Sequence, residues 1–246
     1  MKRILGTAVL SALLALGTFV PQASAQCVTG TGVDILLKWD ANGFSFETGA
    51  PYTNYVSPAG NVLTNVLGVT LFCAPLSGLN PNDPAKEYTM VWSNLVSSGT
   101  VTTPFGASGS KYSTVYTGGA FALYEGPVNA RAWTSSTIPA PAIALPAYLD
   151  GSVILSGVID SLTTTVTRSS LGTVNGSFRG KYRVTGGTYA NQFCAGNSPD
   201  ALMDGLWFPV NPPAGYTGHS NGKFDAPDCT TPAQSTTWGR VKTMYR

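Results

Sequence analysis

Charged residues are scarce in this 246-residue chain, at 11% of the total, where an ordinary domain carries about 25%. Glutamate occurs at three positions only, Glu47, Glu87 and Glu125. Long solvent-exposed helices need a polar face that Glu, Lys and Arg usually supply, so this shortage argues against a mostly helical fold. Gly, Pro, Thr, Ser, Val and Tyr take their place, and these residues favour strands and turns.

Histidine is rarer still, because His219 is the only one in the chain. Residues Gly218 to Gly222 match the G-x-S-x-G motif of a hydrolase nucleophile, but that triad needs a later histidine to take the proton of Ser220. The motif also needs an apolar strand before it, whereas Pro212-Pro213 precede it. We therefore interpret Asn221-Gly222 as a turn, and the same shortage of histidine argues against cysteine catalysis.

Metal-binding patterns are also missing. No C-x-x-C pair is present in the sequence, which argues against a structural zinc site. Residues 40–43, Asp-Ala-Asn-Gly, begin like a calcium loop but lack its later acidic position and fit a hairpin turn better. Residues 80–83 are no more specific, so we predict no metal ligand and no cofactor.

A pair of carboxylates could still hydrolyse a glycoside, since that reaction needs an acid and a base or nucleophile on either side of the sugar bond. The candidate pairs are Asp200 with Asp204, and Asp225 with Asp228. Both pairs lie in segments that contain Pro and Gly, where solvated or capping carboxylates are the usual explanation. We expect no catalysis and keep a carboxylate-dependent glycoside hydrolase as the less favoured alternative.

The first 25 residues have the pattern of a bacterial secretory signal peptide. A charged start at Lys2-Arg3 is followed by a mostly apolar stretch over residues 4–20 and by small residues, Ala23-Ser24-Ala25, before Gln26. Polar interruptions of the apolar stretch argue against a membrane anchor. Gln26 stands where a lipid-modified signal needs a small residue, which argues against lipid attachment to Cys27.

Cleavage would leave a single domain, residues 26–246, without net charge. Once Lys2 and Arg3 are removed, 12 basic residues face 12 acidic residues. No overall field then attracts nucleic acid or an anionic membrane, and no transmembrane anchor is predicted. The expected location is the cell surface or the medium, with the periplasm as the alternative, and the oligomeric state stays open.

Four cysteines remain in that oxidising location, where an even number normally forms disulfides. Three pairings are open. We favour the two bridges between sequence neighbours, because each would fix a terminal segment of the chain. The favoured pairs are Cys27–Cys73 and Cys194–Cys229.

Period-two alternation and β-branched residues predict strands over several stretches. These stretches cover residues 32–40, 44–46, 61–73, 87–96, 111–124, 151–168, 174–185 and 235–245, with a short strand near Val101. Residues 40–43 are expected to form a turn, residues 127–149 a loop with at most one helical turn, and the segment after Cys194 irregular backbone. The predicted fold is all-β, an antiparallel sandwich or jelly roll with long loops and two disulfides.

Two groups of residues are candidates for binding. One predicted strand places Arg179, Lys181 and Arg183 on one face, where they could bind a polyanion or protect an edge strand from pairing. Trp207 and nearby Tyr216 could stack on sugar rings, although most aromatic residues should fill the core. We favour the edge and core roles, which need no partner.

Four short blocks of sequence carry a family resemblance. They are Gly118–Glu125, Asp150–Gly157, Gly176–Phe178 and Val184–Gly187. These blocks resemble a loose group of bacterial exported proteins of unknown role, many of which carry a PEP-CTERM sorting tail. The resemblance implies an antiparallel β fold bound for the cell surface or extracellular matrix, with no catalytic residues to carry over. The chain departs from the group at Val241 to Arg246, which has neither a Pro-Glu-Pro signature nor an apolar span.

Together these patterns predict a secreted or surface-associated bacterial protein with a structural or interaction role and no catalysis. Its partner would be a polysaccharide or another surface protein. The alternative is an extracellular carbohydrate-binding module. Clustered exposed aromatic rings would favour the module, and two converging acids in a cleft would favour the hydrolase.

Overall fold

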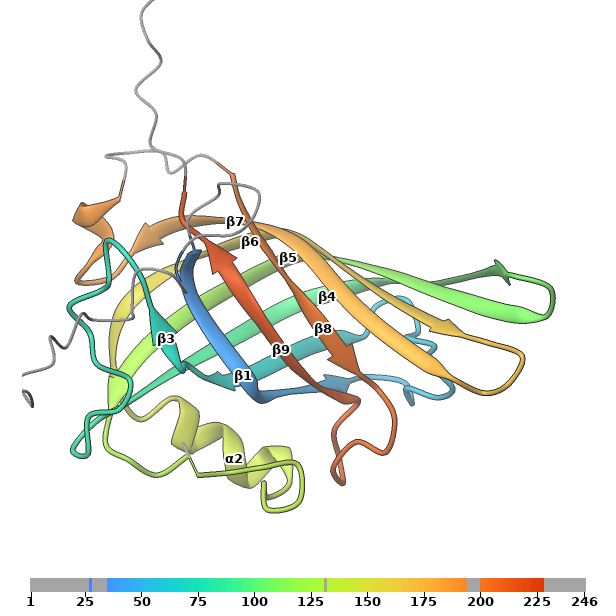
Figure 1. Cartoon of the computed structure of the whole chain (residues 1–246), viewed down its shortest axis with the longest axis horizontal. Helices are drawn as coiled ribbons and strands as arrows, with labels where there is room; N and C mark the ends of the chain where they lie inside the picture. The colour runs from blue at the N-terminus through green and yellow to red at the C-terminus, as the bar shows by residue number, and fades with distance from the viewer. Residues whose placement is uncertain (1–26, 28–34, 131, 194–199, 228–246) are drawn as a thin grey trace, which may run out of the picture.

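The computed structural model describes residue 27 and residues 35–130, 132–193 and 200–227. Figure 1 shows that they form one large sheet with a short helix beside it. The strands are β1 (Ile35–Thr48), β2 (Val62–Gly68), β3 (Leu71–Phe72), β4 (Glu87–Phe105), β5 (Gly109–Gly126), β6 (Ser152–Arg168), β7 (Val174–Gly186), β8 (Ala201–Phe208) and β9 (Gly218–Asp225). The helical elements are α2 (Pro141–Tyr148) and the 3-10 turn η1 (Ala190–Gln192). Every strand pairing in the sheet is antiparallel, and the predicted all-β class is confirmed.

The sheet closes on itself through β1. Its strand order is β2-β4-β5-β6-β7-β8-β9-β1-β3, and β1 pairs with β2 in addition. One edge of β1 pairs with two strands. Residues 43–48 pair with β2, and Leu37 and Lys38 pair with β3. Opposite walls of the sheet therefore face each other across one apolar core, as the two layers of a sandwich do.

The β4–β5 and β6–β7 hairpins extend beyond the other strands at one end of the molecule (Figure 1). β4 continues to Phe105, where we expected a connection with a short strand, because β5 pairs with it along its length. Beyond Val96, no other described strand pairs with the outer edge of β4. Pro104 lies on this edge strand, and a proline there hinders pairing with another chain.

Two segments predicted as turns are strand instead. Asp40 to Gly43 lies inside β1, where a register irregularity between Trp39 and Gly43 takes up the extra residues. Asn221-Gly222 lies inside β9 and pairs with β8, in a region where we expected irregular backbone. A turn signal is a local preference, and pairing with strands far away in the sequence overrides it here.

α2 has eight residues, where we expected a loop with at most one helical turn. Pro141 lies in the first helical turn, where its missing N–H would have no helical partner, and only Pro146 lies inside the helix. Ala144 and Tyr148 are buried with Phe44 in a cluster on the outer face of β1, β2 and β4. This burial stabilises a helix that its prolines disfavour. Within the described part of the chain, no helix is both long and apolar enough to cross a membrane.

One of the two predicted disulfides, Cys27–Cys73, is present. It joins the segment before β1 to the end of β3, and the backbone supports the same arrangement. The Ile35 N–H donates to the Cys27 carbonyl at 2.8 Å, and the Cys73 N–H donates to the Leu36 carbonyl at 2.9 Å. Cys194, Cys229 and the predicted strand 235–245 lie outside the described residues.

Candidate functional site

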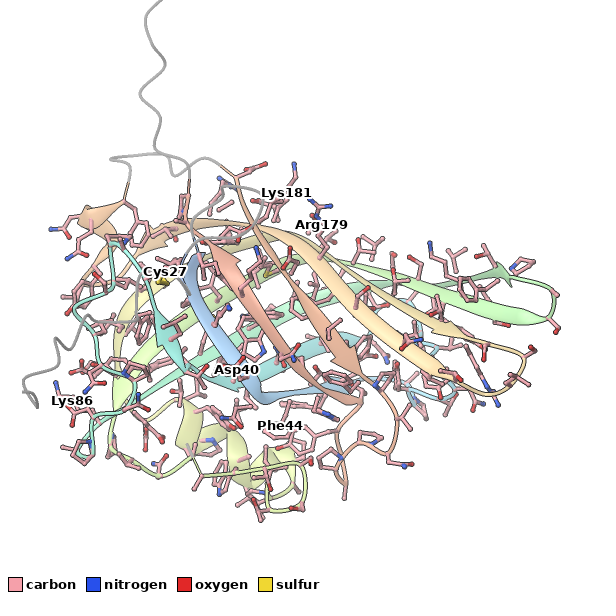
Figure 2. The ribbon with its side chains drawn as sticks, in the orientation of Figure 1. Cys27, Asp40, Phe44, Lys86, Arg179 and Lys181 are labelled. Carbon is pink, nitrogen blue, oxygen red and sulfur yellow. A yellow bond between two sulfur atoms is a disulfide. The ribbon has the colours of Figure 1, made fainter. Side chains whose placement is uncertain are left out.

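The three basic residues that the sequence groups together lie on the outer face of β7. Phe178, Tyr182 and Val184 of β7 are buried, and the residues that alternate with them are exposed or half-buried. Figure 2 shows Arg179 and Lys181 pointing away from the sheet. The alternation predicted for this strand is therefore confirmed. The edge role favoured for these three residues is wrong, because β7 pairs with β6 on one side and with β8 on the other.

A groove of about 390 Å³ lies beside these residues, over β6 and β7. Its polar lining consists of Ser161, Thr163, Thr165, Ser177, Arg179 and Lys181. Four of these side chains are hydroxyls and two are cations, and no carboxylate of the described chain lines the groove. Such a lining can exchange hydrogen bonds with a molecule rich in hydroxyl groups and can attract a negative charge.

The strand register arranges these side chains as a regular array. Thr163 lies opposite Arg179, and Thr165 lies opposite Ser177. Side chains opposite each other on one face lie about 5 Å apart, and the next pair along the strands is about 7 Å away. The guanidinium of Arg179 therefore has hydroxyl groups beside it and further along the groove.

The groove continues over β8 and β9 as a second hollow of about 830 Å³. Arg179 and Leu202 line both hollows, so the two meet at β7 and β8. The charged residues that line the second hollow are Lys38, Asp40, Arg179, Asp204, Lys223 and Asp225. Its charges balance, whereas the lining of the hollow over β6 and β7 is positive.

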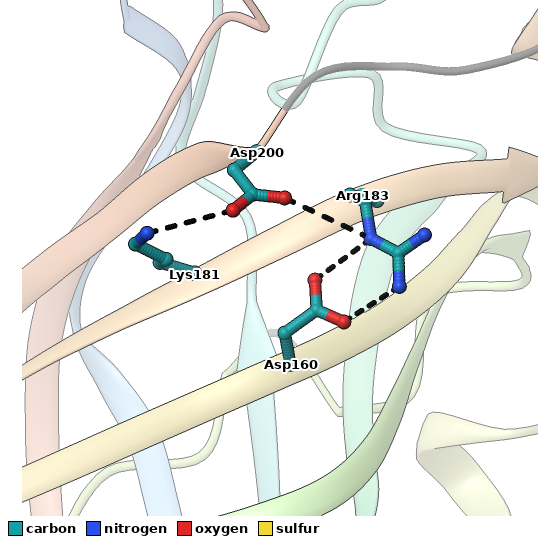
Figure 3. Close-up of polar contacts among 4 residues, drawn as sticks. All are labelled: Asp160, Lys181, Arg183 and Asp200. Carbon is teal, nitrogen blue, oxygen red and sulfur yellow. Dashed lines mark hydrogen bonds and ion pairs between the residues drawn. The ribbon is translucent and has the colours of Figure 1, made fainter.

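Arg183 and Lys181 are paired with carboxylates, as Figure 3 shows. Arg183 donates from Nε and Nη2 to the two oxygens of Asp160, at 2.8 and 2.6 Å. Asp200 lies 3.5 Å from Nζ of Lys181 and 3.8 Å from Nε of Arg183. A register shift in β6 leaves Asp160 as an extra residue, and a bulge of this kind redirects a side chain. It accounts for the approach of this carboxylate to Arg183.

These pairs leave Arg179 as the cation available to a ligand. The hydrogen bond from Arg183 lowers the pKa of Asp160, and Asp160 raises the pKa of Arg183, so both stay charged at neutral pH. Arg179 forms no ion pair or hydrogen bond with any residue that the structure describes. Its charge acts on Asp225 from a distance, more weakly than the charge of Lys223 does.

The structure places Trp207 and Tyr216 in the core, which is the role that the sequence favoured, and argues against the alternative that they stack on sugars. Trp207 is 3% exposed and Tyr216 is 6% exposed. The Trp207 ring packs beside Tyr52 inside the sheet. Tyr216 packs against Phe44 under α2, and its hydroxyl donates to the Pro139 carbonyl at 2.9 Å. A ring must offer a face to solvent to stack on a sugar, and neither ring does so.

The G-x-S-x-G match is a stretch of β9 without the geometry of a nucleophile. Ser220 is buried, and its Oγ accepts a hydrogen bond of 3.2 Å from Nε1 of Trp39. His219 is stacked on Phe208, with ring centroids 4.8 Å apart. Adjacent residues of a strand point to opposite faces, so His219 cannot take the proton of Ser220.

The candidate acid pairs are matched with cations. Lys223 contacts Asp225 and lies 3.8 Å from Asp204, and Asp200 belongs to the ion-pair cluster of Figure 3. Burial raises the pKa of Asp225, and the hydrogen bond from Lys223 opposes that rise. Asp228 lies outside the described residues. Among the residues that are described, no three or more His, Cys, Asp or Glu side chains come together as a metal site.

Sequence reasoning missed the hydroxyl half of the groove. The alternation within 151–168 is a signal that places Thr163 and Thr165 on one face of a strand. Their position opposite Arg179 and Ser177 depends on the β6–β7 register. Because two strands together set this register, it cannot be predicted from the sequence of one strand.

Comparison of the chain with family models, with curated proteins and with solved structures finds no match in any of the three. The resemblance to exported proteins of the PEP-CTERM type therefore stays a prediction.

Proposed function

We propose that this chain is an exported bacterial protein with a non-catalytic interaction role, and that it binds a polysaccharide in the groove over β6 and β7. The signal-peptide pattern of residues 1–25 supports export. The Cys27–Cys73 disulfide supports an oxidising location, either at the cell surface or in the medium, with the periplasm as the alternative.

The observation that carries this proposal is the lining of the groove, with four hydroxyls, two cations and no carboxylate from the residues that the structure describes. Sugars present many hydroxyl groups, and Ser and Thr side chains can both donate to them and accept from them. Leu202 adds an apolar contact for the carbon face of a sugar ring. Because the groove continues into the hollow over β8 and β9, a polymer can extend past the first binding position.

The arrangement of the acids supports a role without catalysis. Glycoside hydrolysis needs one acid and one base or nucleophile on either side of the sugar bond. Asp204 and Asp225 share the cation Lys223, and Asp200 lies among Lys181 and Arg183. These carboxylates are placed to neutralise cations on the outer face of the sheet.

Isothermal titration calorimetry of the oxidised chain 26–246 against neutral and carboxylated polysaccharides tests the proposal. Calorimetry is the suitable readout, because Trp39, Trp92 and Trp207 are buried and would report poorly on a ligand at the outer face. Ser177→Trp fills the groove and should abolish binding. Ser152→Trp changes an exposed residue at the far end of β6 and should bind like the unmodified protein. If no polysaccharide binds, or if Ser177→Trp binds unchanged, the proposal fails.

A further inference from the structure

We infer that the groove selects carboxylated saccharides, and that Arg179 is the residue that binds their carboxylate. This inference rests on the proposed function and names the ligand class of the same groove. It depends on the difference between Arg179 and the two other cations of β7.

The difference lies in what each cation already contacts. Arg183 makes two hydrogen bonds to Asp160, and Lys181 lies 3.5 Å from Asp200. Arg179 is exposed and makes no ion pair within the described ranges of the chain. A ligand carboxylate at Arg179 therefore displaces none of the carboxylates that the structure describes.

Two carboxylates, Asp204 and Asp225, lie on the β8 and β9 side of Arg179. Asp204 lies opposite Arg179 in register, and its ion pair is with Lys223 at 3.8 Å. Asp225 contacts the same Lys223. On the β6 side of Arg179 the neighbour in register is Thr163, so a negative group is favoured on that side, inside the groove.

The chemistry of the lining fits a uronic acid, a sugar whose ring carries both a carboxylate and hydroxyl groups. A guanidinium is a planar fork that binds a carboxylate through two parallel hydrogen bonds. Thr163 and Ser177, which line the groove beside Arg179, are placed to bind the ring hydroxyls of the same sugar. The lining thus matches both kinds of group on one ligand.

A nucleic acid fits the same surface less well. Its binding strength comes from neutralising many closely spaced phosphates with Lys and Arg. Among the described residues, this groove offers one cation without an ion pair, and Asp204 and Asp225 lie in the adjoining hollow. Residues 26–246 as a whole carry 12 basic residues against 12 acidic residues. Carboxylates spaced one per sugar suit such a surface better than a phosphate backbone.

The test uses the oxidised chain 26–246 with polygalacturonate and alginate as carboxylated probes. Fully methyl-esterified polygalacturonate is the matched probe, because it has the same sugars without the charge. Arg179→Gln should weaken binding of both carboxylated polymers about tenfold or more, since charge-assisted hydrogen bonds contribute at least that much. Binding of the ester should be weak and should not change. Arg179→Lys keeps the charge but loses the fork, and it should fall between.

Lys111→Gln is the matched control variant. It removes one exposed positive charge from the same face of the sheet, outside the groove lining, and should change affinity less than twofold. Arg179 is exposed, so its variants should unfold at the same urea concentration as the unmodified protein.

The outcomes separate this inference from the proposed function. If polysaccharides bind and Ser177→Trp abolishes binding, but Arg179→Gln has no effect or the ester binds equally well, the inference is wrong and the proposed function stands. The inference is also wrong if single-stranded DNA competes as well as polygalacturonate does. If none of the polysaccharides binds, both are wrong.

Discussion

The indole of Trp39 and the phenyl ring of Phe178 stack with centroids 5.8 Å apart and planes 17° from parallel. The two residues come from β1 and β7, which have β8 and β9 between them in the sheet. The residues that separate them in cross-strand register are Gly205 and Gly222. Because these glycines carry no side chain, the two rings can lean over them and meet inside the sheet.

Side chains added at these glycines should therefore destabilise the fold. A Cβ at Gly205 would lie 2.1 Å from the Asn221 carbonyl and 2.6 Å from the Phe178 ring, and a Cβ at Gly222 would lie 2.6 Å from the same ring. We expect Gly205→Ala and Gly222→Ala each to lower the free energy of unfolding by about 1–3 kcal/mol, as overpacking does. Gly78→Ala is the control, because nothing lies within 4 Å of its added Cβ. Urea unfolding curves that coincide for all three variants would contradict the prediction.

The side chain of Glu47 links the loop after β1 to the sheet, and removing this side chain should also destabilise the fold. Its carboxylate accepts hydrogen bonds from Ser57 Oγ, Asn61 Nδ2 and Tyr116 OH, at 2.8, 2.8 and 2.7 Å. Burial, reinforced by the charge of Glu47, raises the pKa of Tyr116, so its phenol keeps the proton that it donates. Glu47→Ala leaves the buried Tyr116 hydroxyl without its acceptor, while Ser57 Oγ keeps Ser97 Oγ and Asn61 Nδ2 keeps the Ala50 carbonyl, and it should lower the free energy of unfolding by about 1–3 kcal/mol.

Glu47→Gln is the matched control, because it retains one acceptor oxygen and should lose less stability than Glu47→Ala. Urea denaturation at pH 7 measures both differences. An alanine variant as stable as the unmodified protein would show that these hydrogen bonds do not contribute to stability.

His219 makes stability depend on pH in the range where imidazoles titrate. Burial lowers its pKa below the ordinary value of 6.5. The unfolded chain therefore takes up the proton more readily than the folded chain does. The contribution of His219 to stability is fully present well above pH 6.5. It decreases as the pH falls through 6.5 towards the pKa of His219 in the folded chain.

Because the chain has one histidine, a single imidazole resonance in the NMR spectrum reports this titration. Its midpoint should lie below that of a denatured sample. His219→Gln should remove the corresponding slope of stability against pH. A native midpoint equal to or above the denatured one would contradict the lowered pKa.

The Cys27–Cys73 disulfide should contribute stability mainly by restricting the unfolded chain. Its two cysteines are 46 positions apart, and closing a loop of about this length is expected to stabilise by about 4 kcal/mol. The double variant Cys27→Ser with Cys73→Ser should lose that amount in urea unfolding without a change in its circular dichroism. A reducing agent should destabilise the unmodified protein by at least this amount. A double variant of unchanged stability would show that the bridge is dispensable.

The general character of the fold could be predicted from single segments of the sequence. The shortage of Glu and the density of Thr, Val and Tyr indicate strands, and the alternation in 174–185 correctly places Arg179 and Lys181 together on an outer face. The Cys27–Cys73 bridge follows from pairing sequence neighbours. Each of these predictions needs only local composition, period or spacing.

The turn at 40–43 and the irregular backbone around Trp207 were predicted wrongly for a shared reason. Asp40 to Gly43 has a turn composition, yet pairing with β9 on both sides of it keeps β1 continuous. Trp207 lies in a segment with several prolines, yet β8 places its ring in the core. In both cases partners far away in the sequence supply more stabilisation than the local preference.

By itself, the sequence of this protein determined that most segments between residues 32 and 185 are extended and that one face of β7 is polar, because both follow from side-chain chemistry repeated along one strand. Only the tertiary structure decided which hydroxyls lie beside Arg179 and which cations are already neutralised. Those relations depend on the pairing register of β6, β7 and β8, and a shift of one residue would turn each side chain to the other face of the sheet.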